Sequence, residues 1–199
     1  MQPSRTLFAL VLAATSMPVL GADGTPQFTA DGALLRPLDY RQWVFVTSGL
    51  GMTYGPARPA PGEPPRFSNV FVNPEAYRTF LTTGRWPDGT FFVLEIRRSA
   101  EHVSIDTGGR TQSEQLLLEA SVKDSERYPD GGWAYFAFDG RGGDDGAAAP
   151  LARSASCYSC HSEHAAVEWT FTQFYPDLFD VARTLGTVRQ DYDPTRKLE

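Results

Sequence analysis

The sequence predicts an α+β fold in which a mainly antiparallel β-sheet packs against a helix near the C-terminal end. Three stretches, 90–98, 115–123 and 133–138, either alternate apolar and polar residues or are rich in aromatic ones, as strands are. The connections between them show no helical pattern, so we expect an antiparallel meander. A helical pattern follows, from about Ser156 through Phe174. Strands first and a helix afterwards favour an α+β domain.

The length of 199 residues fits one domain with a single core, which we place at residues 23–199. The hydrophobic share of 41% and the charged share of 21% are ordinary for a globular protein. The net charge of −6 argues against nucleic acid and anionic lipid as partners. Functions that depend on a basic surface are therefore excluded.

Residues 1–22 have the organisation of an export signal peptide. Arg5 supplies the positive start, a mostly apolar run covers residues 7–20, and two small residues end the segment. An uncleaved membrane anchor is the alternative, but the run is shorter than the about 20 apolar residues that span a bilayer. We expect cleavage after Ala22, a periplasmic mature protein, and no membrane span after cleavage.

Two short strands and one helix are predicted before the meander. Residues 43–46 and 70–72 have strand composition. Asn73 is a good N-cap and Pro74 a good first helical residue, and Gly84 ends the helix.

Helices dominate the prediction for the end of the chain. Residues 140–155 form a linker rich in glycine and alanine, and the helix 156–174 comes next. Pro176 ends that helix, and a last helix is expected over 177–185, ended by Gly186.

Cys157 and Cys160 are the only cysteines, and with His161 they form the pattern Cys-x-x-Cys-His. This pattern is the attachment signature of c-type haem. Residues three apart on a helix lie on the same face, so both thiols can add to the vinyl groups along one porphyrin edge. The adjacent imidazole then ligates the iron. We therefore predict one covalently attached haem c, with His161 as the axial iron ligand.

Three other uses of the two cysteines compete with haem. A redox pair belongs after a strand in a βαβ unit, whereas a segment rich in glycine and alanine precedes this motif. A zinc site needs about four ligands, and beyond the motif only His164 is close in sequence. A plain disulfide is the third alternative. The histidine next to the second cysteine favours haem.

The sixth position of such an iron has three candidate ligands. Met52 is the only methionine after the signal segment and lies in a glycine-rich loop. His102 lies in a loop beside an acidic residue, and His164 is on the same helix as His161, so it cannot cross the ring. The simplest expectation is a five-coordinate iron with one open face.

Six blocks of sequence carry a resemblance to a known family. They are 40–44 (YRQWV), 70–77 (VFVNPEAY), 88–90 (DGT), 118–124 (LEASVKD), 157–161 (CYSCH) and 171–176 (FTQFYP). In this order they resemble the cytochrome P-460 family and its relative cytochrome c′-beta, over about residues 31–178. The resemblance implies a mainly antiparallel sheet, a homodimer, and a five-coordinate haem whose distal face is covered by the sheet.

The same resemblance assigns residues to the distal side of the haem. Hydroxylamine-oxidising members bond a lysine to the porphyrin at the position of Leu94, so the resemblance implies that this crosslink is absent. A distal arginine of those members corresponds to Ser68, and a proton-relaying carboxylate of some members corresponds to Ala120. With Phe92 also facing the iron, the resemblance implies an apolar distal pocket without a base.

Two charged residues near these positions are expected elsewhere. Alternation along the strand turns Glu95 away from the side of Leu94. Lys123 is expected to be a surface charge.

An apolar pocket favours small uncharged ligands, because a charged ligand would lose its hydration there without replacement. We therefore expect a five-coordinate haem c protein that binds nitric oxide or a similar diatomic ligand. One alternative is a haem oxidoreductase acting on hydroxylamine or nitric oxide, and another is an electron-transfer cytochrome with Met52 as sixth ligand. The expected partners are the small nitrogen-oxide or diatomic ligand, a redox partner cytochrome, and a second copy in a homodimer.

Overall fold

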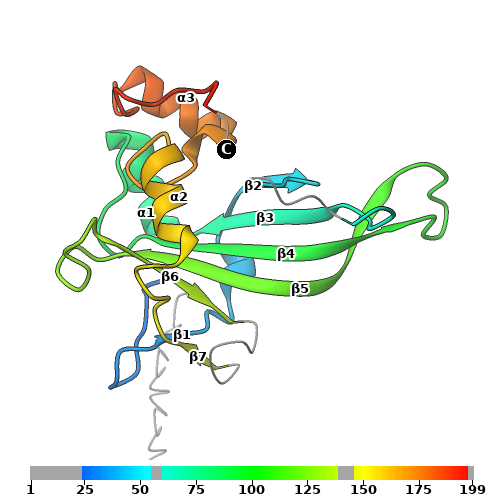
Figure 1. Cartoon of the computed structure of the whole chain (residues 1–199), viewed down its shortest axis with the longest axis horizontal. Coiled ribbons are helices and arrows are strands. Elements are labelled where there is room, and N and C mark those ends of the chain that lie inside the picture. Colours follow the sequence, from blue (N-terminus) through cyan, green and yellow to red (C-terminus); the bar gives the residue numbers. More distant parts are fainter. Residues whose placement is uncertain (1–23, 55–59, 139–145, 197–199) are drawn as a thin grey trace, which may run out of the picture.

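A five-stranded antiparallel sheet forms the centre of the computed structural model, which describes residues 24–54, 60–138 and 146–196 (Figure 1). Its strands are β2 (Val44–Leu50), β3 (Arg66–Val72), β4 (Phe91–Glu101), β5 (Arg110–Lys123) and β6 (Trp133–Ala137). Each strand pairs with its neighbour in sequence, in the order β2-β3-β4-β5-β6. The predicted antiparallel meander is confirmed.

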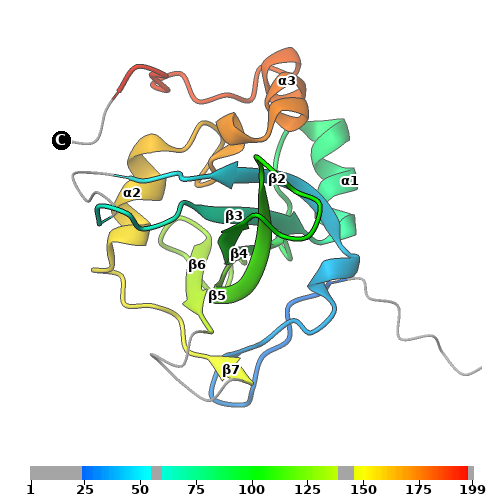
Figure 2. The same cartoon turned by 90° about the vertical axis from the view of Figure 1, so that its right-hand side faces the viewer.

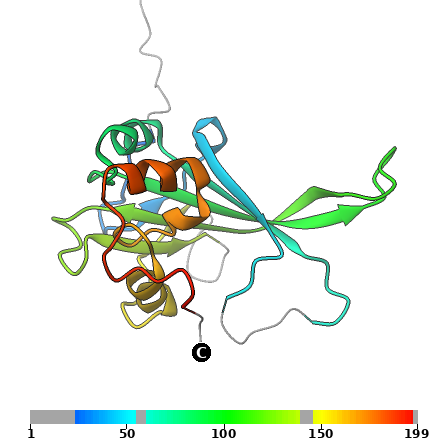
Figure 3. The same ribbon diagram turned by 90° about the horizontal axis from the view of Figure 1, so that it is seen from above.

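The β4–β5 hairpin is longer than the other strands and projects beyond them (Figure 3). β3 accompanies β4 only as far as Arg98, whereas β5 pairs with β4 out to Glu101. The outer part of the hairpin is largely polar. Apolar alternation therefore predicts only its inner part, which belongs to the core.

A small second sheet covers one side of the large one (Figure 2). It pairs β1 (Leu34–Leu35) with β7 (Ala147–Ala148), and the 3-10 helix η1 (Tyr40–Gln42) packs into the same cluster. The buried residues of this first core cluster are Leu34, Tyr40, Trp43, Phe91, Val93, Leu118, Ala120, Val122, Ala134, Phe136, Phe138 and Ala148.

The helices lie on the opposite side of the large sheet (Figure 2). They are α1 (Pro74–Thr83), α2 (Ser156–His164) and α3 (Pro176–Thr184), with a 3-10 turn η2 (Thr172–Phe174) before α3. The second core cluster joins α1 and α3 to the sheet, and its buried residues are Val72, Ala76, Phe80, Trp86, Phe92, Trp133, Val167, Tyr175, Leu178 and Ala182. Helices on one face of a mainly antiparallel sheet confirm the α+β class.

α1 begins and ends where the sequence predicts. Asn73 precedes Pro74 at its start, and Gly84 ends it with a φ of +65°. Asn73 does not cap the helix with its side chain. Its amide nitrogen donates to the Gly89 carbonyl at 3.1 Å, and its amide oxygen accepts from the Phe91 backbone nitrogen at 2.9 Å. Asn73 therefore fixes the turn that leads into β4.

The predicted helix from Ser156 to Phe174 is wrong in its length. α2 ends at His164, and Ala165 after it adopts extended backbone. Ala165, Ala166 and Val167 are buried, so this stretch contributes to the core as an extended segment. The last helix is confirmed, since α3 ends within one residue of the predicted boundary at 185.

The predicted signal peptide, residues 1–22, lies outside the described residues. Within those that are described, no helix has both the length and the apolar character needed to cross a membrane.

Candidate functional site

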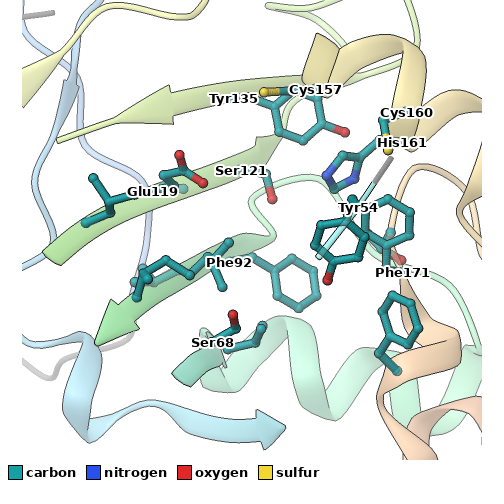
Figure 4. A pocket seen from close by; sticks show the side chains of 18 of the residues that line it. Tyr54, Ser68, Phe92, Glu119, Ser121, Tyr135, Cys157, Cys160, His161 and Phe171 are labelled. Carbon is teal, nitrogen blue, oxygen red and sulfur yellow. The ribbon is translucent and has the colours of Figure 1, made fainter. Parts of the chain in front are cut away.

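A cavity of about 510 Å³ lies between the helix side of the large sheet and the segments α2 and η2 (Figure 4). Its sheet wall includes Thr47 on β2 and Ser68 and Val70 on β3. Cys157, Cys160 and His161 line the same cavity from α2. The cysteines and histidine of the motif therefore line the same cavity as Ser68, which the resemblance places on the distal side.

The motif occupies a short helix whose geometry brings its three side chains together. Cys157 and Cys160 are three residues apart in α2, about one helical turn, and His161 follows directly. Figure 4 shows both sulfur atoms and the imidazole at the same side of the cavity. The helix thus presents two nucleophilic atoms and one metal-binding nitrogen to the same volume.

His161 is held in one orientation from several sides. Its Nδ1 lies 2.8 Å from the Trp169 carbonyl oxygen, and because that oxygen can only accept, Nδ1 carries the proton. The ring packs between Tyr135 and Phe171, with centroid distances of 4.5 and 4.3 Å. Burial lowers the pKa of His161 to about 4. The imidazole is therefore neutral, and the lone pair of Nε2 is available to a metal.

Both cysteines are free thiols that are only partly buried. Burial raises the pKa of Cys157, and the nearby carboxylate of Glu119 adds to the effect. Burial also raises the pKa of Cys160. No cluster of three or more His, Cys, Asp or Glu side chains able to hold a metal ion occurs in the described part of the chain. The zinc alternative thus lacks a ligand set there.

The register of the sheet determines which side chains of β4 and β5 face the cavity. Leu94 pairs with Val70 on β3 and with Glu119 on β5, and all three line the cavity. Directly paired residues of an antiparallel sheet lie on the same face. Phe92 and Ser68 line it too, so Leu94, Phe92 and Ser68 share one cavity with His161, where the resemblance places the distal side.

Ala120 is among the residues that line the cavity, but its side chain lies on the other face of the sheet. It pairs with Val93, and both side chains belong to the first core cluster. Successive residues of a strand face opposite sides, so Glu119 takes the cavity side. The cavity wall is therefore not purely apolar, because it carries a carboxylate that the sequence reasoning missed.

The sequence could have placed Glu119 at the cavity only if its pairing partner on β4 had been known. The alternation of β5 separates Glu119 and Ser121 from Ala120, but it does not say which set meets Leu94. Figure 4 shows Glu119 on the same strand as Ser121, along the cavity wall. Arg66 is a further charged residue that lines the cavity, and its guanidinium pairs with Glu63.

Of the three candidate sixth ligands, Met52 lines the cavity. The Tyr54 hydroxyl lies 3.8 Å from its sulfur, and the Tyr54 ring stacks on Phe171 at 6.3 Å. His102 lies in the projecting hairpin with a side chain that is 72% exposed. His164, the last residue of α2, is not among the residues that line the cavity.

Lys123 is not the surface charge that the sequence suggests. Its amine donates to the Trp86 carbonyl at 2.6 Å and to the Glu168 carboxylate at 2.8 Å. Only 17% of its side chain is exposed. No lysine lines the cavity in the described part of the chain, and Lys197 lies outside it.

The residues around the cavity fit a haem. Two thiols and a neutral imidazole with a free Nε2 stand on one helix, which is the donor set that c-type attachment requires. Aromatic and aliphatic side chains, among them Phe92, Leu94 and Phe171, line the volume beside them. A mostly apolar slot with one nitrogen ligand suits a flat macrocycle with a central metal.

A search of curated proteins found no match to this chain. A family model described as Cytochrome P460 matches residues 37–172, which extend from the residues just before η1 through the motif to the start of η2. The match covers more than half of the chain and includes the strands of the cavity wall as well as α2. The fold, the motif and this match together show that the chain belongs to the cytochrome P460 family, which implies a haem cofactor.

Proposed function

We propose that this protein is a mono-haem c-type cytochrome with a five-coordinate iron, and that it binds nitric oxide or a similar small neutral ligand. Cys157 and Cys160 would attach the haem covalently, and His161 would be the axial ligand. The observation that carries the proposal is that these three side chains share one cavity with the sheet wall of Phe92 and Leu94. When bound, the haem would supply an iron centre for ligand binding and redox chemistry.

The residues of this chain contribute orientation and a dry environment. The Trp169 carbonyl fixes the tautomer and the ring plane of His161. Tyr135 and Phe171 pack on the two sides of the imidazole. Phe92, whose ring packs against Trp86, Trp133 and Tyr175, and Leu94 exclude water from the wall that the sheet provides. A neutral ligand loses little hydration on entering such a volume.

Glu119 favours a second candidate function, the oxidation of hydroxylamine or nitric oxide. Oxidation of an N–H or O–H compound releases protons, and a carboxylate in the cavity can accept them. Glu119 lines the cavity in the register position beside Leu94. Glu119 thus gives the oxidoreductase a proton acceptor that a purely apolar pocket would lack.

Three further properties are part of the proposal. We infer a periplasmic location from the sequence of residues 1–22. A homodimer and a redox partner cytochrome are inferred from the resemblance to the cytochrome P-460 family. Met52 lines the cavity. The electron-transfer alternative requires its sulfur to occupy the sixth coordination position of the iron.

The cofactor is tested by producing the full chain in a host that attaches c-type haem. We expect a pyridine haemochrome of ordinary c type and a high-spin, five-coordinate ferrous spectrum. Replacing both Cys157 and Cys160 by serine should abolish covalent attachment, and His161→Ala should remove the axial ligand. His164→Ala, on the same helix, is the matched control and should keep the spectrum. A colourless wild-type protein from such a host would refute the proposal.

The choice between the functions is tested by ligand binding and turnover. Ligand binding alone predicts a stable nitric oxide complex, with no consumption of hydroxylamine in the presence of an electron acceptor. The oxidoreductase predicts turnover that falls at least about tenfold in Glu119→Gln, because the proton acceptor is lost. A low-spin ferrous spectrum that becomes high-spin in Met52→Leu would instead support electron transfer.

A further inference from the structure

The segment that holds His161 from behind is a tight turn, Val167–Thr170, between α2 and η2. The Thr170 backbone nitrogen donates to the Val167 carbonyl at 2.9 Å and closes the turn. Trp169 occupies its third position, and its carbonyl accepts from Nδ1 of His161. The placement of one peptide group in this turn therefore decides how strong that hydrogen bond is.

The turn has an unfavourable backbone conformation at Glu168. Its φ is +51°, in a backbone region that residues other than glycine rarely adopt. Such conformations persist only where the surroundings impose them. The side chain of Glu168 therefore needs a contact that holds the turn in place.

That contact is the ion pair with Lys123. The Lys123 amine lies 2.8 Å from the Glu168 carboxylate, and the two side chains are only 17% and 20% exposed. The same amine donates to the Trp86 carbonyl at 2.6 Å. Trp86 also donates from its indole nitrogen to the Thr170 hydroxyl at 2.8 Å. Lys123 thus connects the turn to β5 and to the core beneath it.

Two more contacts fix the Trp169 peptide. A Cβ on Gly131 would lie 2.4 Å from the Trp169 ring, so the ring packs directly on glycine backbone. The Tyr135 hydroxyl lies 3.4 Å from the same carbonyl oxygen that His161 uses. The Trp169 ring is thereby held on one side, and the Glu168 carboxylate on the other.

We propose that the Lys123–Glu168 ion pair is a positioning device for the axial ligand: it holds the Trp169 carbonyl against Nδ1 of His161 and thereby sets the electron donation of the imidazole to the iron. The inference rests on the proposed function, because it needs His161 to ligate haem. A stronger hydrogen bond at Nδ1 makes the imidazole a more basic ligand and favours the ferric state. Loosening the turn therefore weakens the iron–histidine bond and raises the reduction potential.

The test uses the haem-loaded full chain. Glu168→Gln and Lys123→Met should each shift the iron–histidine stretching band of the ferrous protein to lower frequency and raise the reduction potential. The double variant should shift no further than the larger single effect, since both changes remove one interaction. Glu75→Gln, which removes an exposed carboxylate from an ion pair on α1, is the matched control and should change neither value.

A second variant separates positioning from stability. Glu168→Gly removes the carboxylate but also relieves the positive φ, so the unfolding midpoint should fall less than in Glu168→Gln while the spectroscopic shift remains. Loaded variants with the wild-type frequency and potential would overturn the inference and leave the proposed function intact. A wild-type chain that takes up no haem would overturn both.

Discussion

Glu95 lies in the middle of β4 with its side chain fully buried, on the face opposite the cavity. The Tyr40 hydroxyl donates to it at 2.8 Å and the Asn69 amide at 3.1 Å. Arg97 pairs with it at 2.9 Å, and Arg41 forms a second ion pair with it. Burial alone would raise the pKa of this carboxyl, but these donors outweigh it and hold the pKa below the ordinary 4.5.

This lowered pKa makes Glu95 a source of pH-dependent stability. A carboxyl whose pKa is lower in the folded state stabilises the fold above its unfolded pKa, and this contribution is lost as the pH falls below about 4.5 and through the folded value. We expect Glu95→Gln to lower the free energy of unfolding by about 2 kcal/mol at neutral pH, because hydrogen bonds to a charged group are lost.

Urea titrations of wild type and Glu95→Gln at several pH values check this prediction. The difference between the two proteins should shrink as the pH falls from about 6 to about 3, since protonation removes the charge in the wild type as well. Glu75→Gln, in an exposed ion pair, is the control and should stay within about 0.5 kcal/mol. A difference that does not depend on pH would contradict the role assigned to the Glu95 charge.

At the scale of the element, two glycines end segments with nearly the same backbone angle in different surroundings. Gly84 follows α1 with a φ of +65°, and a Cβ there would lie 2.5 Å from the Thr187 hydroxyl. Gly186 follows α3 with a φ of +67°, and a Cβ there would meet nothing within 4 Å. Substitution by alanine at Gly186 therefore measures backbone strain alone, whereas substitution at Gly84 adds steric overlap.

We expect Gly186→Ala to cost about 1 kcal/mol, the penalty for a left-handed alanine, and Gly84→Ala to cost at least about 1 kcal/mol more. Thermal unfolding of the two variants measures the difference. Adding Thr187→Ala to Gly84→Ala should recover part of the excess, because the overlapping hydroxyl is removed. Equal losses in the two single variants would show that Thr187 moves aside without cost.

The outer part of the β4–β5 hairpin makes a prediction about local stability. Ser99, Ala100 and Glu101 pair with β5 but with no strand on their other side among the described residues. Two-stranded ribbons are marginal in water, whereas Phe92 and Val93 lie between β3 and β5. Amides of the outer hairpin should therefore exchange with deuterium faster than those near Phe92. Uniform protection along β4 would indicate a further partner for the outer part.

The same elements show how far the sequence alone determines the site. The spacing of Cys157, Cys160 and His161 predicts the motif helix, and the alternation of β4 groups Leu94 with Phe92, but only the resemblance places these two on the cavity side. The register between β4 and β5 is not encoded locally, and a shift of one residue exchanges Ala120 for Glu119 at the cavity wall.

The end of α2 is a second feature that local patterns do not reveal. Residues 165–175 contain no glycine or proline that would stop a helix, so the sequence predicts that the helix continues until Pro176. The chain leaves the helix because Val167 enters the core and Trp169 packs on Gly131. Both contacts are long-range, and tertiary packing overrides propensity here.

At the scale of the whole molecule, one intact mass reports both the cleavage of residues 1–22 and the attachment of haem. We expect the exported protein to have an intact mass that lacks residues 1–22 and includes one covalently bound haem. Peptide mapping would locate the haem on the fragment with Cys157 and Cys160. Retention of the first 22 residues would contradict the predicted cleavage after Ala22.

The homodimer is a separate prediction at this scale. Sedimentation equilibrium of the haem-loaded protein should give twice the mass of one chain, with a dissociation that depends on concentration. The double serine variant of Cys157 and Cys160 tests whether the assembly depends on the bound haem. A single-chain mass at all concentrations would contradict the dimer that the family resemblance implies.

The order of the elements along the chain has a consequence for how the protein matures. Synthesis from the amino end completes all five strands of the large sheet before Cys157 is made, because β6 ends at Ala137. The sheet wall of the proposed haem site can thus fold before the two cysteines that would attach the haem are synthesised. β7 also precedes Cys157, and it pairs with β1 near the beginning of the described chain. That pairing closes the core on the side of the large sheet opposite the cavity, so it can be complete before the thiols are in place.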